Sequence, residues 1–302
     1  MHTRVHRAAP AAALLLALVA CSSPSTTANA PTIGAPTAAE DEQIGCLTTG
    51  GATTVPPTPQ SFRATPGWKR AAEAPAADPG SPAVWAEIEH ELATYQKSDY
   101  QHTTTLDRAA GNYVVDCSGW GNVLLRIAAC DAYGDLVRAA NATRSTSFAT
   151  SCDLPTGAVE HGPYAVDWAQ MLGKLQPGES NGHWTRVAKV ADVVPGDVVT
   201  YALGPGASDT GHVMFAAGTP TQDATNPAEW QVPIADSTES RHGPADSRNN
   251  NPKNVDGHGI GTAAISLIVD QTGAPTNQFR WYPGAPKIDQ VPAAVTLGHF
   301  TG

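Results

Sequence analysis

The amino-acid sequence predicts an α+β domain, and two observations carry this prediction. Apolar residues at helical spacing recur in the first part of the chain, up to about residue 175. Runs of β-branched and aromatic residues, separated by Gly and Pro turns, dominate after residue 193. Helices followed by antiparallel strands are typical of α+β folds. Residues 81–302 are enough for one such domain.

Residues 1–21 have the pattern of an export signal. Two arginines precede an apolar run, residues 8–20, which is too short to span a membrane and ends in Leu-Val-Ala-Cys. This ending resembles a bacterial lipobox. It implies lipidation of Cys21 and attachment to the outer face of a bacterial membrane, and an ordinary secretory signal is the alternative. Residues 22–80 are rich in Ala, Thr, Pro, Ser and Gly, a composition that predicts a flexible stalk.

The first predicted element of the domain is a helix over residues 83–97. Ser81 and Pro82 offer an N-cap and a first helical residue. The apolar residues that follow lie on one helical face: Val84, Trp85, Ile88, Leu92 and Tyr95.

The stretch 114–120, Val-Val-Asp-Cys-Ser-Gly-Trp, predicts a turn into a second helix. Gly119 lets the backbone turn, and apolar residues at near-helical spacing follow it up to Ile127. Cys117 is therefore expected at a helix N-terminus, where unpaired N–H groups and the helix dipole favour an anion. A thiolate is the nucleophilic form of cysteine. The alternative is a buried cysteine that only packs.

Downstream, the pattern changes to strands. Residues 193–201 form a Pro-Gly turn and a β-branched run, and residues 210–218 form a second strand that begins near His212. Residues 230–237 predict a further strand, and 260–270 with 279–282 predict a hairpin. Residues 164–175 have the spacing of an amphipathic helix.

Three motifs in order, Asp-Cys-Ser-Gly-Trp, Pro-Gly-Asp-Val-Val and Gly-His-Val, resemble the NlpC-type cell-wall peptidases, a branch of the papain-like cysteine peptidases. The resemblance covers about residues 95–285. It implies a papain-like fold in which N-terminal helices, with the nucleophile at a helix N-terminus, pack on an antiparallel sheet. Residues 131–180 form a longer segment than is usual in this family, which predicts an insertion. This insertion forms either a wall of the cleft or a packing helix.

The resemblance also implies the site. Cys117 matches the family's nucleophile and His212 its general base, with a strand histidine facing solvent as the alternative for His212. A polar residue on the next strand orients the base in the family. Asp236 is the candidate for that role here, and His242 is its competitor. The Cys117 backbone N–H can stabilise an oxyanion, and Tyr100 or Gln101, upstream of the nucleophile, can add a donor or contact substrate.

Composition limits the partners and cofactors. The net charge is −10 and no Lys/Arg block occurs, which argues against a nucleic-acid partner. Among His183, His212, His242 and His258 no two have a metal-ligand spacing such as His-x3-His, so no metal and no cofactor are expected. Of the five cysteines, one is assigned to lipidation and one to catalysis. The three that remain can form one disulfide. Cys130 with Cys152 closes a loop of about 20 residues, worth about 3 kcal/mol. Cys46 is the alternative partner.

The sequence therefore predicts an exported, membrane-anchored thiol hydrolase that cleaves amide bonds of peptidoglycan stem peptides. Two other functions stay open. One is a non-catalytic envelope-binding or scaffolding protein on the same fold, because fold does not fix function. The other is acyl or amide transfer through the same thiol, because a thioester can react with an amine in place of water. The bond cleaved and the oligomeric state do not follow from the sequence.

Overall fold

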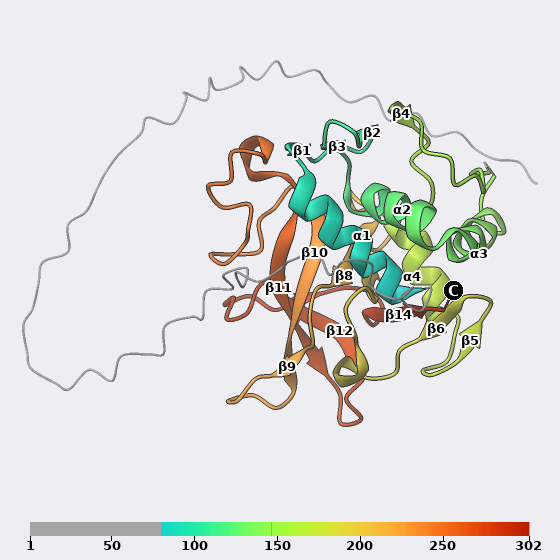
Figure 1. The fold of residues 1–302 in the computed structure, drawn as a ribbon. Helices are drawn as coiled ribbons and strands as arrows, with labels where there is room; N and C mark the ends of the chain where they lie inside the picture. The colour runs from blue at the N-terminus through green and yellow to red at the C-terminus, as the bar shows by residue number, and fades with distance from the viewer. Residues whose placement is uncertain (1–79, 146, 302) are drawn as a thin grey trace, which may run out of the picture. The chain divides into compact units, whose positions relative to one another are not determined.

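A computed structural model describes residues 80–145 and 147–301 of the chain (Figure 1). The described part is a mixed α+β structure, which confirms the predicted fold class. The export signal, the lipidation of Cys21, the stalk and Cys46 lie outside the described residues. Among the described residues no helix is long and apolar enough to cross a membrane.

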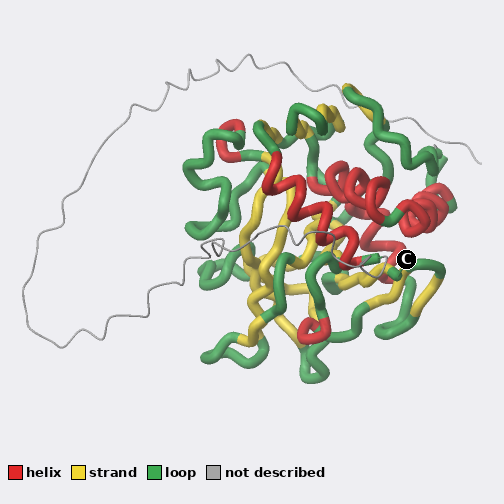
Figure 2. Tube along the Cα trace, in the orientation of Figure 1, coloured by secondary structure: helices red, strands yellow, loops and turns green. Residues whose placement is uncertain are grey.

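The described α-helices lie on one side of the large sheet (Figure 1, Figure 2). They are α1 (Ser81–Thr94), α2 (Cys117–Ala128), α3 (Cys130–Asn141) and α4 (Ala165–Gly173). Two short 3-10 helices cover Val190–Asp192 and Val255–Gly257.

The first helix begins and ends earlier than the prediction of 83–97. Its N-cap is Gly80, and Ser81 lies inside the helix, where its buried hydroxyl accepts a hydrogen bond from the Phe300 N–H at 3.2 Å. The predicted capping role of Ser81 is therefore wrong, because the hydroxyl instead joins the helix to the C-terminal strand. The helix stops at Thr94 because residues 97–99 pair with a strand of the small sheet.

A small sheet precedes the nucleophile helix. It has the order β1-β3-β2-β4, with β1 (Lys97–Asp99), β2 (Thr104–Asp107), β3 (Asn112–Val114) and β4 (Gly157–Val159). The expected order of helices first and antiparallel strands afterwards is thus wrong in detail, since β1 to β3 come before α2 and β1 runs parallel to β3. These strands are three or four residues long, too short for a clear period in the sequence.

The large sheet has ten strands in the order β13-β12-β11-β10-β8-β7-β14-β6-β5, with β9 paired to β10. The pairings among them are antiparallel. The strands are β5 (Ser180–Asn181), β6 (Trp184–Arg186), β7 (Val198–Ala202), β8 (Gly211–Ala216), β9 (Thr221–Gln222), β10 (Glu229–Thr238), β11 (Gly259–Val269), β12 (Pro275–Arg280), β13 (Asp289–Gln290) and β14 (Thr296–Phe300). The predicted strands at 198–201, 210–218 and 230–237 and the predicted hairpin are confirmed.

Each face of the large sheet buries its own core. Val213 and Phe215 of β8 face the helices and pack with Trp120 and Trp168, whereas Met214 belongs to a second cluster on the opposite face. Alternate residues of one strand thus enter different cores, as the two-residue period of a strand requires. The second core closes on itself, because the sheet curls until the ring of Tyr201 on β7 lies 4.8 Å from that of Phe279 on β12.

Helix α4 confirms the amphipathic pattern seen at 164–175. Trp168 and Leu172 are completely buried, and the indole of Trp168 meets Trp184 and Phe215 edge to face. Within the predicted insertion 131–180, α4 is therefore a packing helix of the core. Helix α3, at the start of the same segment, had no counterpart among the sequence predictions.

Candidate active site

Helix α2 begins at Cys117, as the sequence predicts. Asp116 is its N-cap, with an extended backbone, and its side chain accepts the Gly119 N–H at 2.7 Å. This bond satisfies one of the unpaired donors of the first turn. Gly119 is required at this position, because a Cβ atom there would lie 2.8 Å from the hydroxyl of Thr104 and 3.1 Å from the carboxylate of Asp116.

The thiol of Cys117 lies in an environment that favours its protonated form. The residue is buried, with 3% of its surface exposed, and it is the free cysteine of the described residues. Burial and then the neighbouring charge of Asp116 raise the pKa of the thiol well above its usual value, whereas the Val213 N–H opposes this rise. A nucleophilic thiolate therefore needs a base that removes the proton as the reaction begins.

His212 stands next to the residue whose amide contacts this sulfur. It lies near the start of β8, and its Nε2 is 2.7 Å from Oδ2 of Asp236 on β10. An ionised carboxylate only accepts hydrogen bonds, so Nε2 carries the proton and Nδ1 is left as an acceptor. No hydrogen bond of Nδ1 occurs among the described residues. The arrangement fixes the ring as the tautomer whose Nδ1 can take a proton.

Asp236 is completely buried, and three side chains contact its carboxylate. His212 and His242 both lie on Oδ2, the latter through Nε2 at 2.9 Å, and Arg248 donates to Oδ1. Burial disfavours the charge of Asp236, but the Arg248 guanidinium and His242 outweigh this and hold the pKa of the carboxyl well below its usual range. Asp236 is thus an ionised acceptor behind His212 at neutral pH.

His242 binds behind Asp236 and does not contact His212 directly. Its ring is stacked on Trp281, with centroids 3.7 Å apart, and lies 6.1 Å from the ring of His212. Its Nδ1 is 2.8 Å from the Trp281 carbonyl oxygen while Nε2 faces Asp236. The structure therefore places Asp236 in direct contact with the base His212, whereas His242 contacts Asp236 and not His212.

The two predicted upstream residues are placed differently. Tyr100 is near the nucleophile: burial raises the pKa of its hydroxyl, and the charges of Cys117, Asp209 and Asp116 raise it further. Gln101 is exposed, and its amide points back to the carboxylate of Asp99 at 3.4 Å. The structure thus brings Tyr100 to the site, while Gln101 stays at the surface.

Cys130 and Cys152 form a disulfide across a sequence separation of 22 residues. It joins the start of α3 to the segment between α3 and α4. This is the pairing that the cysteine count suggested, and it excludes Cys46 as a partner of either residue in this structure.

His212, Asp236 and His242 could also hold a metal ion, since one ligand atom from each lies within 4.8 Å of the others. Spacing along the chain gave no sign of this, because His212 on β8 meets Asp236 on β10 only through the fold, and His242 lies in the loop after β10. Two histidines and a carboxylate suit zinc. However, the hydrogen bonds above already account for the three side chains, and the Arg248 cation on the same carboxylate opposes a second cation.

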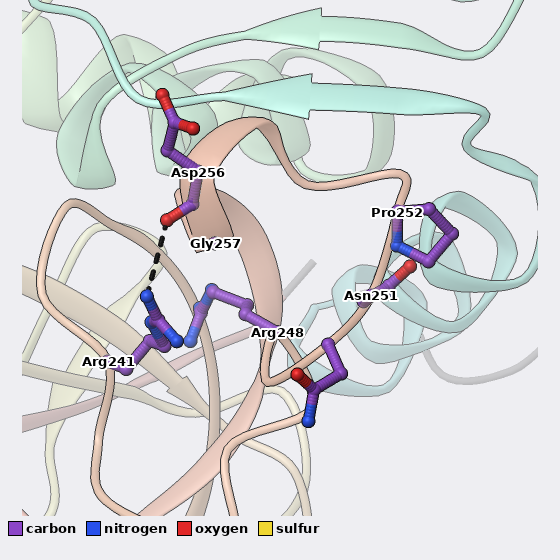
Figure 3. Close-up of a pocket in the computed structure, with 7 residues that line it drawn as sticks. Arg241, Arg248, Asn251, Pro252, Asp256 and Gly257 are labelled. Carbon is purple, nitrogen blue, oxygen red and sulfur yellow. Dashed lines mark hydrogen bonds between the residues drawn. The ribbon is translucent and has the colours of Figure 1, made fainter.

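A hollow of about 430 Å³ is lined by residues of the loop between β10 and β11, Arg248 among them (Figure 3). Its lining residues are Arg241, Arg248, Asn250, Asn251, Pro252, Asp256 and Gly257. Figure 3 shows Arg241 bonded to the backbone oxygen of Asp256, at 3.4 Å. Neither Cys117 nor His212 lines this hollow, so it is separate from the catalytic groups.

Sequence reasoning missed three groups around the site. Arg248 is buried beneath Asp236, Trp281 stacks on His242, and His161 bonds both oxygens of Asp116 at 2.9 Å. None carries a local motif. His161 follows Asp116 by 45 residues and Arg248 follows Asp236 by 12, so only the fold brings each pair together.

Comparisons with protein-family models, with curated proteins and with solved structures found no match to this chain.

Proposed function

We propose that this protein is a thiol hydrolase with a papain-like, NlpC-type fold that cleaves amide bonds of cell-wall stem peptides. The observation that carries the proposal is the set Cys117, His212 and Asp236. A cysteine at a helix N-terminus is bonded to the Val213 N–H of β8, next to His212, whose Nε2 is held by a buried carboxylate. These are the nucleophile, base and orienting group that thiol-dependent acyl transfer requires.

The reaction begins with proton transfer from the thiol to Nδ1 of His212. The thiolate attacks the carbonyl carbon of the peptide, and the oxyanion lies at the N-terminus of α2, where the Cys117 backbone N–H has no partner within the helix. The imidazolium then gives its proton to the leaving amine, and a thioester forms. Water, deprotonated by the same ring, cleaves the thioester and releases the acid. Asp236 stabilises the imidazolium at both stages.

The substrate class rests on the three-motif resemblance of the sequence. The net charge of −10 gives no long-range attraction to an anionic polymer, so recognition of the peptide depends on contacts at short range. Tyr100, half-buried beside the nucleophile, is a candidate for such a contact.

The test is incubation of the purified full chain with cell-wall fragments, with the products identified by mass spectrometry. We expect fragments that gain one water at a peptide bond. Cys117→Ala should lower the rate at least about a thousandfold, because it removes the nucleophile and little volume. His212→Ala should have an effect of similar size, whereas Gln101→Ala, at the exposed surface, should have little.

Equal cleavage by the wild type and Cys117→Ala would contradict the proposal. Products joined to an added amine, without hydrolysis, would instead indicate transfer through the same thioester. Binding of the fragments without any product would favour an envelope-binding role.

A further inference from the structure

The nucleophile has an acidic neighbour that works against it. Asp116 lies immediately before Cys117, is buried, and its charge is the second largest cause, after burial, of the raised pKa of the thiol. The residue is nevertheless needed as the N-cap of α2. A site with this geometry favours a thiolate only if the charge of Asp116 is offset nearby.

His161 is placed to offset this charge. Its Nε2 lies 2.9 Å from both carboxylate oxygens of Asp116, and its Nδ1 lies 3.1 Å from the carbonyl oxygen of Gly162. Both partners only accept hydrogen bonds, so both ring nitrogens donate and the ring is an imidazolium. The pKa of His161 agrees with this. Burial disfavours the positive charge of the ring, but the hydrogen bond and charge of Asp116 outweigh the effect of burial and raise the pKa of His161. Reciprocally, despite burial, His161 lowers the pKa of Asp116.

The segment that carries His161 is fixed to α2 from several sides. The Asn122 side-chain amide donates to the carbonyls of His161 and Pro163, at 2.7 and 2.8 Å. Arg126 donates to the carbonyls of Asp153 and Glu160. Cys152 joins the same segment to α3. His161 is therefore held against the N-cap by contacts of its segment with Asn122 and Arg126 of α2.

The other charged groups near His161 do not replace it. His102, on the loop before β2, also meets Asp116 at 3.2 Å, but 67% of its side chain is exposed against 11% for His161. Water screens such an exposed pair. Arg144 lies over the ring of Tyr164, which packs on His161, and its charge is paired with Asp167. Arg126 uses its donors on backbone carbonyls.

The groups that face Cys117 from other elements act in the same direction as Asp116. Asp209, before β8, and Asp236, on β10, are the further charges that raise the pKa of the thiol. Tyr100 and Tyr201 are near enough for the thiolate to raise the pKa of their own hydroxyls. His161 is the group that offsets one of these charges, that of Asp116.

We propose that His161 is a positioning residue whose imidazolium neutralises Asp116 and thereby favours the thiolate of Cys117. This inference deepens the proposed function and rests on it only in treating Cys117 as the nucleophile.

The test measures the thiolate without any substrate. Iodoacetamide alkylates the full chain at a series of pH values, and mass spectrometry of the Cys117 peptide gives the rate at this site alone. His161→Gln keeps a donor toward Asp116 but removes the charge. We expect the midpoint of the pH profile to rise by about one unit, and alkylation at pH 7 to fall roughly tenfold.

Two variants separate electrostatics from structure. Adding Asp116→Asn to His161→Gln should return the midpoint toward that of the wild type, because the uncompensated charge is gone and Asn still caps the helix. His102→Gln, the matched control on the same carboxylate, should shift the midpoint much less. A purely structural role would make the double variant worse than the single one.

The proposal is overturned by an unchanged midpoint in His161→Gln, by failure of Asp116→Asn to restore it, or by an equal shift in His102→Gln. Should His161→Gln not fold, an NMR titration of the wild-type ring decides, and a neutral His161 at pH 7 rejects the proposal. Failure of the proposed function looks different, since alkylation of Cys117 can follow the expected profile even where no cell-wall fragment is cleaved.

Discussion

Two carboxylates, Asp116 and Asp236, lie near the nucleophile, and each is buried and bonded to a histidine. The difference between them lies in what they orient. Asp236 fixes the tautomer of the base, whereas Asp116 caps the helix that carries the thiol. Because each is ionised, each would raise the cost of a thiolate without its cationic partners. The cationic partners Arg248, beside Asp236, and His161, beside Asp116, are therefore part of the proposed catalytic arrangement.

Asp236→Asn should lower turnover of cell-wall fragments by at least about a hundredfold. The amide that replaces the carboxylate can donate toward His212, which favours the tautomer with a proton on Nδ1, the wrong one for a base. Kinetics by mass spectrometry, at matched thermal stability, check this. His242→Asn, behind Asp236, should do much less. An active Asp236→Asn beside an inactive His242→Asn would transfer the orienting role to His242.

Arg248→Met should destabilise the protein by about 3–5 kcal/mol, because it leaves two buried carboxylates without their cation. Arg248 pairs with Asp236 and with Asp246, the latter at 2.8 Å, and all three side chains are completely buried. Urea unfolding measures the change. The control is Arg138→Met, whose guanidinium is largely exposed beside Asp135 and should cost at most about 1 kcal/mol. Equal losses in the two variants would contradict this account.

At the scale of elements, the sequence predicted those with a long, regular pattern. Helices α1, α2 and α4, the strands β7, β8 and β10 and the hairpin of β11 with β12 all have several apolar residues in register. The small sheet and the edge strands were missed because two to four residues cannot display a period. Asp236 was found because it lies near the end of a recognisable strand. His161 and Arg248 lie in irregular segments, where a single sequence gives no indication of distant contacts.

Removal of the disulfide with Cys130→Ser/Cys152→Ser should lower the free energy of unfolding by about 3 kcal/mol, the chain-entropy cost of opening a loop of this length. It should also loosen the segment that holds His161, so alkylation of Cys117 at pH 7 should slow. Urea unfolding and the iodoacetamide rate measure the two effects. Ser151→Ala, beside Cys152 at the exposed surface, is the control and should change neither. An unchanged unfolding energy would contradict this account.

At the scale of the whole molecule, buried acids make opposite contributions to the pH dependence of stability. The folded-state pKa of Asp236 and of Asp116 is lowered, so their contributions are present above the pKa of the unfolded chain and are lost as pH falls. Glu91 on α1 does the reverse. Its Oε2 accepts the indole N–H of Trp120 on α2 at 2.6 Å, its Oε1 has no hydrogen-bond partner, and Arg108 lies 3.6 Å away.

Burial raises the pKa of Glu91 to about 8, although the bond from Trp120 opposes the rise. Between pH 4.5 and 8 the folded protein keeps a proton that the unfolded chain has released, so its stability falls as pH rises, by up to about 1.4 kcal/mol per unit. Glu91→Gln keeps the acceptor for Trp120 and removes the titration. Urea unfolding at pH 5 to 8 should therefore show a flatter profile for Glu91→Gln. Glu87→Gln, one turn earlier on α1, leaves Glu91 in place and should keep the slope. A Glu91→Gln profile as steep as that of the wild type would show that Glu91 is ionised within the fold.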